Sequence, residues 1–207
     1  MALESPEASD AAEAIAEAAE EKADNDRFRR RAAIVIGTMA MLLAISGLGG
    51  GNATKEMLNA NIQASDTYAF YQAKNIRQTS YQLAQAELRV LLATHPDMPS
   101  EAQAQVRNDL ARYDATIARY ESEPATGEGK QELLVKAQAL EQRRDRAARQ
   151  DPNFDYAQAL YQIAIVLGSV SIVAASRRLL LLGVGLGVVA TVLAVNGFFL
   201  LFELPIG

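Results

Sequence analysis

Three long stretches without a charged residue constrain this chain more than any other feature of its sequence. They cover residues 32–48, 157–175 and 179–202, and all of the charged residues lie outside them. A helix needs about 20 apolar residues to cross the ~30 Å hydrocarbon core of a bilayer. The sequence therefore predicts an all-α integral membrane protein with three transmembrane helices and a long helical excursion between the first and the second.

The boundaries of the predicted segments follow from where charge and apolar character change. In chain order they are an acidic N-terminal tail, partly disordered or helical (1–26), a basic flank with the first span (27–51), an extramembrane helical hairpin stalk (52–155), the second span (156–175), a short basic loop (176–178), the third span (179–202) and a C-terminal tail (203–207). A signal peptide normally begins with its basic region, whereas an acidic tail comes first here. The first span is therefore expected to be a retained anchor.

The basic residues next to the spans predict the orientation, because Lys and Arg in short flanks resist translocation. The relevant residues precede the first span or fill the loop between the second and third, and they are Arg27, Arg29, Arg30, Arg31, Arg177 and Arg178. Three spans place these two groups on the same side. We therefore expect a cytoplasmic N-terminus, with the stalk and the C-terminus on the outer side.

The outgoing part of the excursion is predicted to be a helix from about residue 52 to 94, because it contains no Pro and no Gly. A seam of residues recurs along it at alternating spacings of four and three, namely Leu58, Ile62, Ser65, Ala69, Gln72, Ile76, Thr79, Leu83, Ala86 and Val90. Such spacing is typical of a coiled coil. Its small and polar members favour close packing in a bundle over a stable isolated dimer. Whether this helix is continuous with the first span through 49–51 is left open.

Two breaks divide the returning part of the excursion. Prolines within 95–99 end the outgoing helix, and the segment 124–129 separates two shorter returning helices, 100–123 and about 130–150. Asp151 followed by Pro152 is the pattern of an N-cap with proline at the first helical position. A new helix is therefore predicted to begin there and to enter the membrane.

The residue inventory argues against an enzyme. Cysteine is absent and His95 is the only histidine, so thiolate nucleophiles and sites with several histidines are excluded by count. The segment Gly127–Lys130 resembles the end of a phosphate-binding loop, but Pro124 and Gln131 stand where that loop needs Gly and Ser or Thr. No cofactor, metal or nucleotide is expected. Nucleic-acid binding is not expected either, because the formal net charge is −5.

The spans carry small and polar residues in place of charges. Small residues on one helix face allow another helix to approach closely, and those residues are Gly183 and Gly187 in the third span and Ala164, Gly168 and Ser171 in the second. These two faces are expected to meet either within one hairpin or between subunits. The polar side chains within lipid that matter most are Asn196, Gln162 and Thr191, which are expected to hydrogen-bond a neighbouring helix or to line a path.

Several stretches resemble a bacterial membrane-protein family described as domain of unknown function 4337. They are the junction Gly49–Asn52, the run Gln63–Gln78, the segment Phe154–Val166 and the triplet Asn196–Phe198. The resemblance covers residues 27 to 203. It implies a bacterial inner-membrane protein of this layout, and it does not imply an activity.

Two functional hypotheses follow. The preferred one is a non-enzymatic structural, scaffold or accessory protein of the lipid bilayer that forms a homo-oligomer or joins a larger membrane complex. The alternative is an oligomeric channel or transporter component whose pore is lined by the polar residues of the spans. Candidate contacts to a partner or within the bundle are the mixed aromatic and charged residues Tyr68, Phe70, Tyr71, Lys74 and Arg77.

Overall fold

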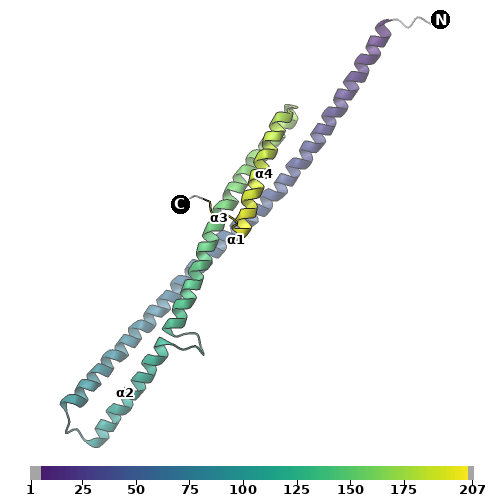
Figure 1. Cartoon of the computed structure of the whole chain (residues 1–207). Coiled ribbons are helices and arrows are strands. Elements are labelled where there is room, and N and C mark those ends of the chain that lie inside the picture. The colour runs from purple at the N-terminus through teal and green to yellow at the C-terminus, as the bar shows by residue number, and fades with distance from the viewer. Residues whose placement is uncertain (1–5, 205–207) are drawn as a thin grey trace. The chain divides into compact units, whose positions relative to one another are not determined.

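The computed structural model describes residues 6–204, with side chains from residue 13 onward, and it contains four helices and no strand in that range (Figure 1). The helices are α1 (Pro6–Thr94), α2 (Ser100–Glu121), α3 (Lys130–Val173) and α4 (Arg177–Phe199). The all-α prediction is confirmed. Residues 1–5 and 205–207 of the predicted tails lie outside the described residues.

The chain divides into two compact units, which we name by their composition. The apolar unit comprises Met1–Thr54 with Ala148–Gly207, and the hairpin unit comprises Lys55–Ala147. Three helices, α1, α3 and α4, are long and apolar enough to cross a membrane. The number of candidate spans therefore agrees with the sequence prediction.

Small side chains let the helices of the apolar unit approach closely. Its buried cluster consists of Met39, Ala157, Tyr161, Ala164, Ala190 and Ala194. A Cβ atom added to Gly183 of α4 would lie 3.0 Å from the carbonyl oxygen of Ala164 in α3. Added Cβ atoms on Gly168 and Gly187 would lie 2.8 Å and 2.6 Å from side chains of α1. The small faces of α3 and α4 therefore meet within one chain, and α1 fills the remaining space.

Helix α1 continues without a break through three consecutive glycines, which answers the question that the sequence left open. Glycine costs about 1 kcal/mol in a helix interior relative to Ala. Tertiary packing offsets this cost, because a Cβ added to Gly49 would lie 2.5 Å from the Phe154 ring and one added to Gly50 would lie 3.2 Å from the Phe154 Cβ. These two glycines provide the space that the aromatic ring of α3 occupies.

The predicted helix start at Asp151 and Pro152 is wrong. Helix α3 runs from Lys130 to Val173 with Pro152 inside it, so the third helix of the excursion and the second span are one helix. Proline removes a backbone hydrogen bond and disfavours a helix interior. Here the side-chain amide of Asn153 donates to the carbonyl of Arg149 at 2.9 Å. The adjacent Phe154 is only 2% exposed, so packing holds this part of α3 in place.

The turn between α3 and α4 lies slightly earlier than predicted. Residues 174–176 form it, and Arg177 and Arg178 belong to the first turn of α4. Ala175 adopts a left-handed conformation with φ of 48°, and the backbone N–H of Ser176 donates to the carbonyl of Ser171 at 3.0 Å. In this arrangement a single left-handed residue ends the helix, and a backbone N–H that follows it satisfies a free carbonyl group of the last turn. No polar side chain is needed for the turn.

In the hairpin unit, α1 packs against α2 and the beginning of α3 (Figure 1). The side chains that α1 buries there are small or polar, and they are Ala60, Ala64, Thr67, Lys74, Gln78 and Gln85. Aromatic contacts supplement them. The Tyr81 ring of α1 lies 5.3 Å from that of Tyr113 and 5.9 Å from that of Tyr120, both in α2. None of the side chains of α2 is fully buried.

The predicted coiled-coil seam does not pack within the hairpin unit. All ten seam residues, from Leu58 to Val90, are exposed in the hairpin unit. The buried residues of α1 lie instead on the opposite side of the helix. Ala64 and Thr67 follow Ile62 by two and five positions, and Gln78 follows Ile76 by two. At 3.6 residues per turn, those positions point away from the seam. Buried polar contacts therefore decide which face of α1 receives α2 and α3.

Candidate functional site

The most concentrated group of charged residues surrounds Lys74, in the middle of the hairpin unit. This lysine is only 5% exposed. Its ammonium group lies 3.6 Å from a carboxylate oxygen of Glu128 and 3.9 Å from one of Glu123. It also lies over the rings of Phe70 and Tyr120, at 5.1 Å and 5.8 Å from their centroids. A buried ammonium is tolerated only when such partners compensate for its lost hydration.

A second lysine extends this cluster toward the end of α2. The ammonium of Lys130 donates to the side-chain oxygen of Gln78 at 2.8 Å and contacts a carboxylate oxygen of Glu121 at 3.3 Å. The Gln78 amide in turn donates to the same Glu121 oxygen at 3.0 Å and to the backbone carbonyl of Ile117 at 3.1 Å. The Gln78 amide and the Lys130 ammonium lower the pKa of the Glu121 carboxyl group. This arrangement joins α1, α2 and α3.

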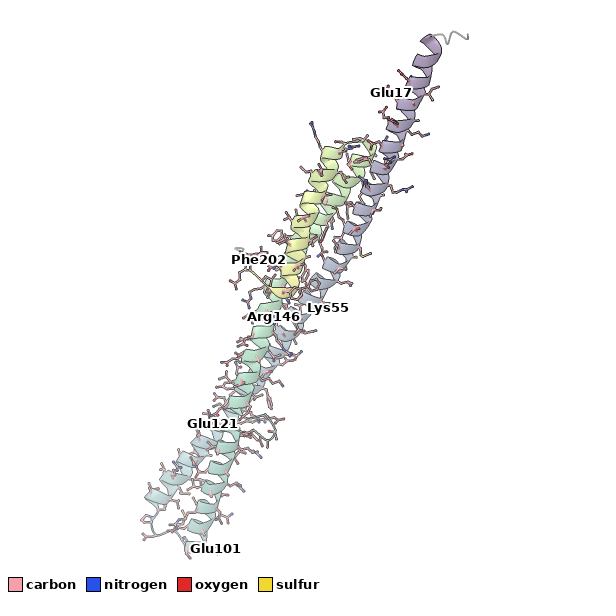
Figure 2. All side chains as sticks on the ribbon, turned by 45° about the vertical axis from the view of Figure 1, so that its right-hand side comes forward. Glu17, Lys55, Glu101, Glu121, Arg146 and Phe202 are labelled. Carbon is pink, nitrogen blue, oxygen red and sulfur yellow. The ribbon has the colours of Figure 1, made fainter. Side chains whose placement is uncertain are left out.

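Glu132 holds the loop between α2 and α3 in place. Figure 2 labels Glu121, the last residue of α2, where this loop begins. The Glu132 carboxylate accepts a hydrogen bond from the Ser122 hydroxyl at 2.6 Å and one from the Glu123 backbone N–H at 3.1 Å. These two hydrogen bonds lower the pKa of Glu132, the Ser122 bond most strongly. A Cβ on Gly129 would overlap Ser122 and the Glu123 backbone. The loop therefore needs glycine at this position.

The five candidate contact residues divide between the two sides of α1. Lys74 is buried, and Tyr68 and Tyr71 are half-buried. Partial burial and the neighbouring Glu141 carboxylate raise the pKa of Tyr68. Phe70 and Arg77 remain exposed. The packing of Lys74, Tyr68 and Tyr71 is therefore internal to the hairpin unit, and Phe70 and Arg77 are the members that a partner can reach.

Chemically, the Lys74 cluster is a set of ion pairs and amide hydrogen bonds at the break between two helices. The described residues contain no group of three or more His, Cys, Asp or Glu side chains arranged to hold a metal ion. Each carboxylate named above accepts a hydrogen bond or faces a lysine. The arrangement is suited to fixing the returning helices against α1.

In the apolar unit, a buried pair of amides fixes the end of α4. The Asn196 side-chain amide donates to the Asn153 side-chain oxygen at 2.7 Å and to the Phe202 carbonyl at 2.9 Å. Its oxygen accepts from the Phe202 backbone N–H at 3.0 Å. Asn196 is fully buried. Its side chain thus holds the chain that follows α4 against α3.

The other two polar residues of the spans differ from Asn196. The Thr191 hydroxyl lies 2.9 Å from the Tyr161 hydroxyl and donates to the Gly187 carbonyl at 2.8 Å. Gln162 is exposed on the outer side of α3, beside Ile163 and Val166. Ser171, by contrast, is buried and donates to the Gly168 carbonyl of its own helix at 2.6 Å. Gln162 is therefore the one of these polar groups that a second molecule can reach.

The basic residues that set the predicted orientation lie at one end of the apolar unit. Asp24 of α1 forms an ion pair with Arg177 at the start of α4. The same hollow is lined by Arg27 and Arg31, together with apolar residues. Arg177 at the start of α4 and the arginines of α1 thus share one end of the unit.

Three of the four stretches that carry the family resemblance meet around one aromatic ring. The Phe154 ring of α3 lies between Gly49 of α1 and Gly197 of α4, where added Cβ atoms would lie 2.5 Å and 2.8 Å from the ring. The Phe198 ring packs edge to face against it at 4.8 Å. Sequence reasoning did not find this junction. A signal existed, since glycines in the first and third spans accompany a Phe just before the second.

We predict that replacing Asn196 with Leu destabilises the apolar unit. The change leaves the buried Asn153 amide oxygen and the Phe202 backbone without their partner, which typically costs about 1–3 kcal/mol. Gln162→Leu is the matched control, because this side chain is exposed. Thermal unfolding in detergent, followed by circular dichroism, measures both. Equal midpoints for the two variants would show that the amide pair is not structural.

We also predict that acid destabilises the hairpin unit. The folded-state pKa values of Glu121 and Glu132 are lowered, so their stabilisation is present above the unfolded value of about 4.3 and is lost as the pH falls through the folded values. Melting temperatures between pH 7 and pH 3 measure this loss in the full chain. Glu132→Gln should flatten the acid limb, and the exposed control Glu56→Gln should not. An unchanged limb in Glu132→Gln would contradict the role given to Glu132.

Comparison with known proteins agrees with the resemblance carried by these stretches. Neither a curated protein nor a solved structure matches the chain. A family described as Domain of unknown function (DUF4337) matches residues 28–200, which is most of the chain and includes both units. The chain therefore belongs to the domain of unknown function 4337 family.

Proposed function

We propose that this protein is a non-enzymatic scaffold or accessory protein of the bacterial inner membrane, which self-associates or joins a larger membrane complex. In this proposal α1, α3 and α4 cross the membrane, the N-terminus is cytoplasmic, and the hairpin unit is periplasmic. The clustering of arginines at one end of the apolar unit supports this orientation, because such residues are retained on the cytoplasmic side.

The observation that carries the proposal is a set of large apolar side chains left uncovered on the hairpin unit. Leu58, Ile62, Ile76, Leu83 and Val90 are each between 53% and 67% exposed. Outside the lipid, large apolar side chains that are exposed along one face of a helix are costly in water and favour association. The polar groups of the Lys74 cluster, by contrast, are engaged in internal contacts. Association is therefore a better use of this surface than catalysis.

The channel alternative has little support from the polar residues that suggested it. The Asn196 amide is buried and hydrogen-bonded within the chain, and the Thr191 hydroxyl is bonded to Tyr161 and Gly187. Only Gln162 remains available to line a path between copies. A pore requires several such groups along its length. The scaffold proposal is therefore preferred.

Native mass measurement after extraction in a mild detergent tests the proposed function. We expect particles that contain two or more copies of the chain, or a stable complex with other chains. A strictly monomeric particle without a co-purifying partner would refute the proposal. Ion flux into liposomes that contain only this protein is the complementary measurement, and a flux that Gln162→Leu abolishes would favour the channel alternative.

A further inference from the structure

We infer that the exposed seam of α1 binds a second copy of this chain, so that the two α1 helices form a parallel, in-register coiled coil. The seam consists of Leu58, Ile62, Ser65, Ala69, Gln72, Ile76, Thr79, Leu83, Ala86 and Val90, all of them exposed. This inference rests on the proposed self-association and names its partner and surface.

The first step is that the seam is complete and unused within the hairpin unit. Its spacings alternate between four and three without interruption, which is the repeat that keeps one stripe facing a partner helix. Packing against α2 and α3 uses the opposite side of α1, where Lys74, Gln78 and Gln85 are buried. A partner can therefore dock on the seam without displacing any part of the hairpin unit.

The second step concerns which residues would face each other. The seam alternates between two sets of positions, one apolar (Ile62, Ala69, Ile76, Leu83 and Val90) and one mostly small or polar (Leu58, Ser65, Gln72, Thr79 and Ala86). In a parallel in-register pair, each residue meets its own counterpart, so apolar layers and polar layers stay separate. In an antiparallel pair the two sets would face each other. The segregation of the sets therefore favours the parallel arrangement.

Particular residues strengthen this choice. Gln72 would meet the Gln72 of the partner copy, and a side-chain amide both donates and accepts, so the two can pair with each other. The β-branched Ile62, Ile76 and Val90 stand at the positions where such residues favour two strands. The surface is thus complementary to itself.

In this register, the residues that flank the seam in one copy do not repel those of the second copy. The residues beside it are mostly uncharged, with Asp66, Glu87 and Arg89 as the exceptions. In a parallel pair, Asp66 would lie beside Asn61 of the second copy and Glu87 beside Gln82, which are uncharged. Arg89 already faces Asp114 of α2 at 3.8 Å. Between Leu58 and Val90, no like charges are brought together.

The third step is that copies in one membrane meet in this orientation. Two copies with the same topology are parallel, and their seams begin at the same number of residues from the first span. Confinement to one membrane also raises their effective concentration. A seam too weak to hold isolated helices together in solution is therefore sufficient for anchored copies.

The seven-residue spacing also continues back along the sequence of α1. The set that contains Leu58 passes through Gly51, Ala44 and Gly37, and the set that contains Ile62 passes through Lys55, Leu48 and Met41. Within the apolar unit, nothing lies within 4 Å of the place that a Cβ on Gly51 or Gly37 would occupy. Small residues that no helix of the same chain covers allow a close approach by another chain in lipid.

The absence of cysteine from the natural chain makes a disulfide test direct. Ala69→Cys and Ala86→Cys place a thiol at the seam, and Ala115→Cys places one on the exposed side of α2 as the matched control. Facing seam positions of a parallel pair bring Cα atoms within about 7 Å, the range that a disulfide spans. In oxidised native membranes, both seam variants should give a product of twice the chain mass, and the control should not.

A second pair of variants tests the seam without cysteine. Ile76→Asp should convert the native-mass particle to smaller species, whereas Val135→Asp, which alters a similarly exposed apolar residue of α3, should not. Both should keep the melting temperature of the hairpin unit, since neither side chain is buried.

The outcomes separate this inference from the proposed function. An assembly in which seam cysteines crosslink no better than Ala115→Cys would overturn the seam inference and leave the scaffold proposal intact. A crosslinked product with a different protein would overturn the second copy as the occupant. A monomeric wild-type chain without a co-purifying partner would refute both.

Discussion

A long helix is stable in water mainly through the surfaces that cover it, and this constraint governs the whole chain. Helix α1 contains 89 residues, and helical propensity alone does not hold such a length in a single conformation. In the apolar unit it is covered by α3, against which Gly49 and Gly50 pack, and by α4, which contacts Met39. In the hairpin unit it is covered on one side only, by α2 and the beginning of α3. The uncovered side is the source of the functional proposal.

The covered side of α1 in the hairpin unit is held by polar contacts. A buried lysine on its own would destabilise the fold, because the charge loses its hydration. Lys74 is compensated by two carboxylates and two aromatic rings, and Gln78 joins all three helices. Such contacts have strict geometric requirements, so they fix the register of α2 and α3 on α1. The apolar residues are thereby left for a surface that is complementary to a second copy.

Hydropathy and turn signals predicted the fold class, the three candidate spans and the breaks near 95–99 and 124–129. The small residues Gly183 and Ala164 were also identified as a packing face, because missing side chains are visible in a sequence. The prediction failed at Pro152, where the surrounding packing outweighs the local preference of proline. The sequence also did not indicate which side of α1 is buried within the chain. Apolar periodicity indicates a contact surface, but it does not say whether the partner belongs to the same chain.

The candidate site was less accessible to sequence reasoning than the fold. Lys74 and Tyr71 were recognised as unusual, but their partners Glu123, Glu128 and Lys130 lie far along the chain. The Phe154 junction likewise depends on Gly49 and Gly197, which no local pattern connects. Asn196 was identified as an intramembrane polar residue. Its structural role became evident only from Asn153 and Phe202, which occupy its hydrogen bonds.

The central claim is that α1 uses one face within the chain and the opposite face to bind its own copy. Distances between spin labels on two copies test it most directly, with single labels placed in separate samples beside Leu58 and beside Val90. Parallel, in-register helices pack about 8–10 Å apart, so both samples should give short distances of about 20 Å or less. Antiparallel helices would separate the labels by about 45 Å or more at both ends, by the helix rise. That result, or the absence of any distance between copies, would contradict the account.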